Sequence, residues 1–277
     1  MKKHILSCVL ALAAVMLLPV SAVAKTIVMI PGFQAQGMDW RFNQVTPMLQ
    51  SDGWVDGGNY TMTTGGVVNN MQLPGRPADV LFTLNLPTTA GIATQAAILN
   101  EYLKAIYQRR QEPLTLVGHS AGGVVARHWL VTSAQVPVEA LVTIASPHTG
   151  TPMAQVTRLL LSNTDILNLA NKFGFGHLKD AKSLFKDLQE EKPGNYLYWL
   201  NHQPHPAIRY AAIVRSSDKP ESVDFIVPEY SQDMNNTYAL NGRAERWNSE
   251  DGHLLSANDG YLLAAIMNYV PQGASTP

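Results

Sequence analysis

Residues 114–125 read LTLVGHSAGGVV, and this stretch decides how the rest of the chain is interpreted. The apolar run 114–117 has strand character, and the segment after Gly123, VVARHWL, is compatible with a helix. Between them lies a G-x-S-x-G motif centred on Ser120. A sharp strand-to-helix turn holds such a serine in a strained backbone conformation, and its glycines let the neighbouring chain pass close by. The pattern predicts a nucleophilic serine, with the Ala121 amide at a helix N-terminus where it can stabilise an oxyanion.

The start of the chain has the features of an export signal. Residues 1–24 combine a basic start, an apolar stretch over 5–18 and the small-residue cleavage motif AVA at 22–24. The apolar stretch is too short to span a membrane. We therefore expect a periplasmic or secreted protein whose mature chain forms one domain, residues 25–277. The only cysteine, Cys8, lies in the signal, so we expect neither disulfides nor a cysteine-ligated metal.

Composition excludes some classes of partner. Hydrophobic residues make up 46% of the chain and charged residues 15%, which is enough apolar material for a sizeable core. Removal of Lys2 and Lys3 with the signal leaves 18 basic and 21 acidic residues, a net charge near −3. This balance gives no electrostatic basis for binding nucleic acid or an anionic membrane. We expect no nucleic-acid partner and no stable membrane insertion after the signal is removed, and the oligomeric state stays open.

Strand and helix patterns alternate along the chain, which predicts an α/β fold with a mainly parallel central sheet and helices on both faces. Besides the strand before Ser120, the candidate strands are 25–30, 80–86, 138–145 and 208–214, and the candidate helices are 41–51, 90–110 and 261–269. Residues 55–77 and 235–250 are polar, and we expect them to be irregular. Residues 154–201 read as a helical insertion, either a cap over the site or a plain helix pair on the sheet.

A serine hydroxyl needs a base to take its proton and a third group to orient that base. In this fold class the chain order is serine, then acid, then histidine. Six histidines follow Ser120, but only His253 also follows the acid-bearing loop after the last strand, so we expect His253 to be the base. Asp224 is the favoured acid because the apolar stretch after it would bury its carboxylate. The alternatives are Asp218, Asp233 and Asp251.

The loop after the first strand, PGFQAQGMDW over 31–40, is expected to supply a second oxyanion donor, the Phe33 amide. The alternative is an ordinary turn that ends a strand.

The other histidines have simpler interpretations. His119 beside the nucleophile is expected to be structural, and His128 on the following helix to be packed. His148 follows a strand end and could line the site. His202 and His205 have a spacing that metals use, but prolines surround them and no carboxylate accompanies them, so we expect no metal there.

Four segments, IVMIPGF, LVGHSAGG, SVDFIVPEYS and DGHLL, resemble those of the α/β-hydrolase superfamily, in particular exported bacterial lipases and esterases. The resemblance extends over nearly the whole mature chain and is specific at these motifs. It implies the α/β-hydrolase fold and no cofactor. It also implies a triad of Ser120, Asp224 and His253, and an oxyanion hole formed by the Phe33 and Ala121 amides.

One departure concerns Pro31-Gly32, where many lipases have His-Gly. Because the oxyanion donor is a main-chain amide, this difference does not remove the hole. The resemblance implies hydrolysis of a small-molecule or lipid carboxylic ester through an acyl-enzyme on Ser120. The alternatives are an acyltransferase, thioesterase or amidase on the same fold, and, further off, a non-catalytic exported binding protein.

Overall fold

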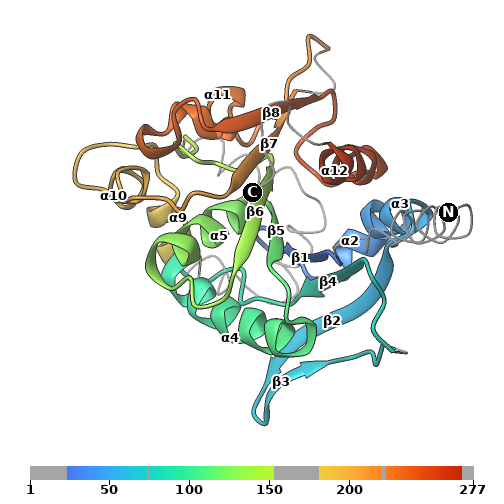
Figure 1. Cartoon of the computed structure of the whole chain (residues 1–277). Helices are drawn as coiled ribbons and strands as arrows, with labels where there is room; N and C mark the ends of the chain where they lie inside the picture. Colours follow the sequence, from blue (N-terminus) through green and yellow to red (C-terminus); the bar gives the residue numbers. More distant parts are fainter. Residues whose placement is uncertain (1–23, 74, 153–180, 220–222, 270–277) are drawn as a thin grey trace, which may run out of the picture.

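A computed structural model describes residues 24–73, 75–152, 181–219 and 223–269 (Figure 1). Within them the strands form one eight-stranded sheet in the order β3-β2-β4-β1-β5-β6-β7-β8. Neighbouring strands are parallel, except that β3 runs antiparallel to β2. The strands are β1 (Thr26–Ile30), β2 (Val55–Thr63), β3 (Gly66–Asn69), β4 (Val80–Leu84), β5 (Leu114–His119), β6 (Val138–Ile144), β7 (Arg209–Arg215) and β8 (Ala244–Ser249).

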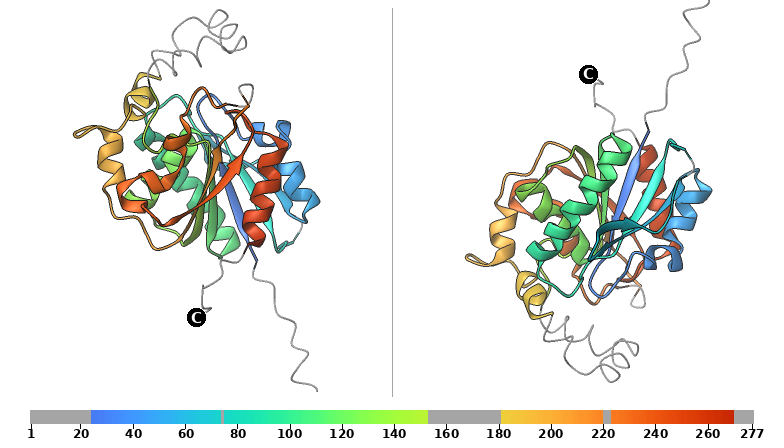
Figure 2. Two further views of the ribbon diagram at one scale, coloured as in Figure 1. Left: turned by 90° about the horizontal axis from the view of Figure 1, so that it is seen from above. Right: turned by 90° about the horizontal axis from the view of Figure 1, so that it is seen from below.

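Helices cover both faces of this sheet, as Figures 1 and 2 show. They are α2 (Asp39–Phe42), α3 (Val45–Ser51), α4 (Ile92–Arg110), α5 (Ala121–Thr132), α9 (Lys182–Asp187), α10 (Tyr196–Asn201), α11 (Glu229–Gln232) and α12 (Ala257–Asn268). Two short 3-10 helices, η3 (Met234–Asn236) and η4 (Tyr238–Leu240), precede β8. The predicted α/β class with a mainly parallel, doubly covered sheet is therefore confirmed.

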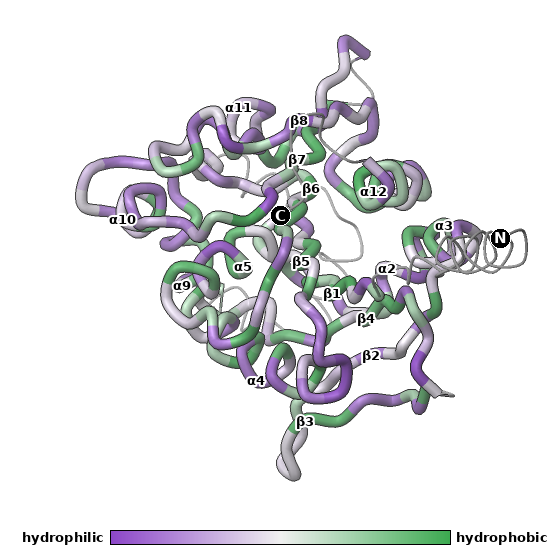
Figure 3. The backbone as a smooth tube through the Cα atoms, viewed as in Figure 1, coloured by the Kyte–Doolittle hydropathy of each residue, from purple (hydrophilic) through white to green (hydrophobic). Residues whose placement is uncertain are grey.

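The two cores follow from the alternation of side chains along each strand. In β1, Val28 and Ile30 belong to the core under α4 and α5, whereas Ile27 and Met29 belong to the core under α2, α3 and α12. All four side chains are fully buried. Figure 3 shows that the strands at the centre are mainly hydrophobic and the outer loops mainly hydrophilic.

The expectation that residues 55–77 are irregular was wrong, because β2 and β3 lie there. β2 carries two glycines and no clean apolar alternation, and its register with β4 shifts between Asp56 and Asn59. A Cβ at Gly57 would lie 2.3 Å from the Phe82 ring, so the glycine is needed where β2 passes β4. Pairing with β4, rather than the pattern of its own residues, makes this segment a strand.

Residues 235–250 were also expected to be irregular, but they contain η3, η4 and the edge strand β8. The sequence of β8, AERWNS, is polar because an edge strand has one side open to water. It is held to β7 by Arg209, whose guanidinium donates to both carboxylate oxygens of Glu245 at 2.8 and 2.9 Å.

The helix expected over 41–51 is divided into α2 and α3 at Gln44, which has a left-handed backbone (φ 65°).

Part of the sequence interpretation lies outside the described residues. This applies to the export signal and to residues 153–180 of the expected insertion. The remainder of that insertion contains α9 and α10. Among the described helices, none is both long and apolar enough to cross a membrane.

Candidate active site

The turn between β5 and α5 places Ser120 at the carboxyl edge of the sheet in a strained conformation, with φ 50° and ψ −126°. Its glycines are required by close backbone approaches. A Cβ at Gly118 would lie 2.5 Å from the backbone of Gly123, and one at Gly122 would lie 2.5 Å from the Ile30 carbonyl oxygen. The Ser120 amide donates to the Ile144 carbonyl at 2.8 Å, which fixes the turn to the neighbouring strand.

The structure brings Ser120, His253 and Asp224 into one hydrogen-bonded chain. His253 Nδ1 lies 2.8 Å from Asp224 Oδ2, and His253 Nε2 lies 3.0 Å from Ser120 Oγ. A carboxylate can only accept, so Nδ1 carries the proton and the neutral ring accepts the serine hydroxyl at Nε2. This arrangement allows His253 to take the hydroxyl proton.

Asp224 lies in a loop that holds its carboxylate ionised. Oδ1 accepts the amides of Ile226 and Val227 at 2.9 and 3.0 Å. Burial of the side chain raises its pKa, but His253 and these two amides lower it by more, so the pKa of Asp224 lies below its usual value. The charged form that would support an imidazolium is therefore the stable one.

Gln232, at the end of α11, connects Asp224 to the sheet. Its Nε2 donates to Asp224 Oδ2 at 3.0 Å and to the Val227 carbonyl at 2.8 Å, while its Oε1 accepts the Arg215 amide at 2.8 Å. The side chain is fully buried and each of its polar atoms has a partner. Gln232 thus fixes the acid to the end of β7.

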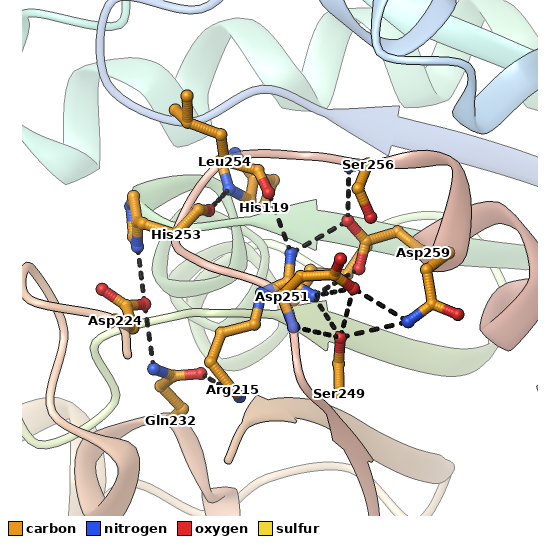
Figure 4. Close-up of polar contacts among 12 residues, drawn as sticks. His119, Arg215, Asp224, Gln232, Ser249, Asp251, His253, Leu254, Ser256 and Asp259 are labelled. Atoms are coloured by element: carbon orange, nitrogen blue, oxygen red, sulfur yellow. Dashed lines mark hydrogen bonds and ion pairs between the residues drawn. The ribbon is translucent and has the colours of Figure 1, made fainter. Parts of the chain in front are cut away.

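The His253 loop is anchored by a buried ion pair (Figure 4). Arg215, at the end of β7, donates to both carboxylate oxygens of Asp259 at 2.6 and 2.9 Å, and neither side chain is exposed. The same guanidinium donates to the Leu254 carbonyl at 3.2 Å and to Ser249 Oγ at 3.0 Å. Because Leu254 follows His253 directly, this network positions the histidine.

His119 contacts the backbone of His253. Its Nε2 lies 2.9 Å from the His253 carbonyl oxygen, and its ring packs edge-on against Trp40. Burial first, and then the neighbouring His253, lower the pKa of His119 to about 3. His119 is therefore neutral at ordinary pH, and its expected structural role becomes specific: it donates to the main chain of His253.

The two expected oxyanion donors lie beside Ser120. A Cβ at Gly32 would lie 2.8 Å from Ser120 Cβ, so the loop that carries Phe33 passes directly against the serine. Ala121 is the first residue of α5, where the helix leaves the amide free. Within the described residues, no hydrogen bond engages the Phe33 amide. Both N–H groups are therefore available to a substrate oxygen.

Two of the other candidate acids, Asp233 and Asp251, are engaged elsewhere. Asp233 accepts the Asn235 amide at 2.9 Å, and Asp251 accepts the Asn258 side chain at 2.8 Å. Within the described ranges, the three alternative acids form no hydrogen bond to His253, which pairs with Asp224. The three are Asp218, Asp233 and Asp251.

His148 was open to lining the site, but it belongs to a separate buried cluster around Arg127 of α5. Arg127 lies 3.3 Å from His148 Nδ1, 3.2 Å from His205 Nε2 and 2.8 Å from Asn201 Oδ1. Burial lowers the pKa of Arg127 to about 10, and none of the described carboxylates forms an ion pair with it. The cluster joins α5 to α10 and to the loop after β6. Among the described residues, no group of three His, Cys, Asp or Glu side chains could hold a metal.

Solved structures share this fold over most of the chain. A Listeria innocua protein superposes with a TM-score of 0.62 at 15% identity, covering 90% of this chain and 96% of its own. The mature Bacillus licheniformis lipase BlEst2 gives 0.58 at 16% identity, covering 91% and 96%. A metagenomic carboxyl esterase, MGS0156, gives 0.53 at 16% identity, covering 90% and 76%. The protein has the α/β-hydrolase fold.

Sequence comparison adds two more distant similarities. Residues 89–174 match the PGAP1-like alpha/beta domain family. Triacylglycerol lipase 2 of Saccharomyces cerevisiae is 23% identical over 146 residues, which is 52% of this chain. The chain spans about two fifths of the length of that yeast protein, with 42% of it covered.

Three residues that organise this site were not singled out from sequence: Arg215, Gln232 and Asp259. One signal was present, because an arginine at the end of a buried strand requires a buried partner. Its partner, Asp259, lies 44 positions away, so no local spacing indicates it.

Proposed function

We propose that this protein is a serine hydrolase that cleaves carboxylic esters through an acyl-enzyme on Ser120. The observation that carries the proposal is the hydrogen-bonded chain from Ser120 Oγ through His253 to Asp224, at 3.0 and 2.8 Å. The yeast protein and BlEst2 bear the name lipase, and MGS0156 the name esterase, which makes esters the first substrate class to test.

In the first step, Ser120 Oγ attacks the ester carbonyl carbon and its proton passes to His253 Nε2. The carbonyl oxygen becomes an oxyanion that accepts the Phe33 and Ala121 amides, each of which contributes about 3 kcal/mol in comparable sites. Asp224 stabilises the imidazolium. When the ester C–O bond breaks, His253 returns the proton to the departing alkoxide oxygen, and an alcohol leaves.

The second step reverses these roles. His253 takes a proton from water while the hydroxide oxygen attacks the acyl carbon, and the Ser120 ester bond breaks. The carboxylic acid leaves and Ser120 Oγ regains its proton from His253. The enzyme returns to its starting protonation state.

We further propose that the protein acts outside the cytoplasm, since residues 1–24 read as an export signal. Cell fractionation after expression of the full-length chain tests this: the protein should appear in the periplasm or medium in a processed form whose first residue is residue 25.

The function is tested by hydrolysis of p-nitrophenyl esters from acetyl to palmitoyl, with Ser120→Ala as the matched variant. Removal of the nucleophile should lower kcat by about 10⁴-fold or more, because the site then lacks the group that forms the acyl-enzyme. A fluorophosphonate probe should label the wild type and not the variant. Full activity in Ser120→Ala would contradict the proposal.

A further inference from the structure

The ring of Phe185 on α9 packs against the loop 31–37, which carries the Phe33 amide. The Phe33 and Phe185 rings meet edge to face, with 5.1 Å between their centroids and 61° between their planes. We propose that Phe185 is a positioning residue that holds this amide in the direction of the substrate oxyanion. The inference rests on the proposed function and adds a residue to it. Phe185 acts through Phe33 and does not touch the reacting atoms.

The two ends of the loop 31–37 are fixed through their backbone. Near its start, a Cβ at Gly32 would lie 2.8 Å from Ser120 Cβ, so the chain is pressed against the nucleophile. At its end, the Gly37 amide donates to Asn85 Oδ1 at 2.9 Å, which ties the loop to the end of β4. These contacts set the path of the loop but leave the residues between them to be held by their side chains.

The middle of the loop needs such support. Gln34 has a left-handed backbone (φ 56°), and a strained residue of this kind persists only where the surrounding contacts hold it. The Phe33 amide before it has no hydrogen-bond partner among the described residues. Its direction therefore depends on the Phe33 side chain, which packs against the core under α4 and α5. Within the same part of the chain, the aromatic ring that contacts this side chain is that of Phe185.

The helix that carries Phe185 is itself anchored on both sides of this residue. Leu184 and Leu188 are buried in the core under α4 and α5. Asp187 Oδ2 accepts the Ile92 amide at 2.9 Å, which joins α9 to the start of α4. Because its neighbours are fixed to the body of the protein, the Phe185 ring can hold the loop rather than follow it.

Loss of the Phe185 ring should slow the reaction without weakening ester binding. Removal of one oxyanion donor lowers kcat by about 10²–10³-fold, and misplacement by about 1 Å can cost about 10²-fold. We therefore expect Phe185→Ala to lower kcat by about 10- to 100-fold and to leave KM nearly unchanged, because the donor acts mainly in the transition state. Phe185→Leu keeps apolar bulk against Phe33 and should recover most of the rate.

A double-mutant cycle tests whether Phe185 acts through Phe33. Phe33→Ala keeps the main-chain amide and removes the ring, so kcat should fall by a similar factor. The double variant should be no slower than the slower single variant, because both changes remove the same contact. In each case kcat is expressed per site labelled by the fluorophosphonate probe, so that unfolded protein does not count. Lys186→Ala, at an exposed position of α9, is the matched control and should keep the wild-type kcat.

A trifluoromethyl ketone reports on the oxyanion directly. When Ser120 Oγ adds to its carbonyl carbon, the carbonyl oxygen becomes an oxyanion that needs the same amides. Its inhibition constant should rise in Phe185→Ala by about the factor by which kcat falls, and should recover in Phe185→Leu. A residue that only stabilises the fold would lower unfolding free energy and leave this constant unchanged.

The outcomes distinguish this inference from the proposed function. Absence of any Ser120-dependent ester hydrolysis overturns both. If hydrolysis depends on Ser120 but Phe185→Ala keeps the wild-type kcat, changes KM alone, or multiplies its effect with that of Phe33→Ala, the function stands and the positioning role is overturned. A fall in kcat that the two rings share and that the ketone reproduces supports it.

Discussion

At the residue scale, three groups act on His253 from three directions. Asp224 holds Nδ1, Ser120 lies at Nε2, and His119 donates to the main-chain carbonyl. Because that carbonyl can only accept, His119 carries its proton on Nε2, and its buried Nδ1 has no hydrogen-bond partner among the described residues. Ring and backbone of the base are therefore fixed independently, which is what general-base geometry requires.

Gln232 is an uncharged neighbour of Asp224, which holds the base. Replacement of Gln232 by glutamate tests whether a charge at this position affects His253. The amide donates to Asp224 Oδ2, whereas a glutamate could do so only when protonated. Once ionised, Gln232→Glu adds a second negative charge near His253, which favours the imidazolium over the neutral ring. Since His253 must be neutral to act as base, the acid limb of the kcat/KM profile should move to higher pH by about one unit.

The measurement is kcat/KM against pH for the wild type and Gln232→Glu. Gln232→Met is the control, because it removes the donor without adding charge and should move the limb little. If the glutamate variant has an unmoved acid limb and differs only in folding stability, Gln232 is a structural residue alone.

At the element scale, the end of β7 organises both loops of the site. The Arg215 amide holds Gln232, and its guanidinium holds Asp259 in the first turn of α12. Asp259 also accepts the Ser256 amide at 2.9 Å, which caps the start of α12. One strand end thus fixes the acid loop, the histidine loop and the start of the last helix.

Loss of the charge at Asp259 should be costly. Asp259→Asn keeps a side-chain acceptor for the cap but leaves Arg215 buried without its counterion, and breaking such a pair costs about 3–5 kcal/mol of unfolding free energy. Glu245→Gln is the control, because the Arg209–Glu245 pair is partly exposed, at 23% and 25%, and should contribute about 1 kcal/mol or less. Urea denaturation measures both. Equal losses in the two variants would contradict the argument.

The central elements could be predicted because their signals are local. β1, β5 and β6 are apolar runs, and the glycines around Ser120 mark a turn that few other residues permit. β2 and β8 could not be predicted, because their residues are polar and only pairing with a neighbour makes them strands. The chain order of Ser120, Asp224 and His253 identified groups that the fold brings together, although their chemical roles stay a prediction.

At the scale of the whole molecule, buried neutral histidines link stability to pH. Burial first, and then the charge of Arg127, lower the pKa of His148 well below its usual value and that of His205 to about 4. The pKa of His119 is lowered to about 3, first by burial and then by His253. Below the unfolded value of about 6.5, the unfolded chain binds protons that the folded chain does not.

Unfolding free energy should therefore fall as pH decreases from about 6.5, by about 1.4 kcal/mol per pH unit for each of these histidines, down to the folded pKa. Urea denaturation of the Ser120→Ala protein between pH 7 and pH 5 measures this slope above the range where carboxylates titrate. His205→Gln removes one of these histidines. The slope of unfolding free energy against pH should therefore decrease by about 1.4 kcal/mol per pH unit, the contribution of one proton. A stability that does not change over this interval would contradict the prediction.

The strand order also sets the sequence of events as the chain is made. β1 is the first strand synthesised, yet it lies in the middle of the sheet, with β4 on one side and β5 on the other. Its register with β5 extends to Gly118, so its hydrogen bonds on that side await the segment that carries Ser120. Such non-local pairing slows folding. β1 is therefore synthesised early but completes its hydrogen bonds late. The centre of the sheet forms together with the turn that carries Ser120.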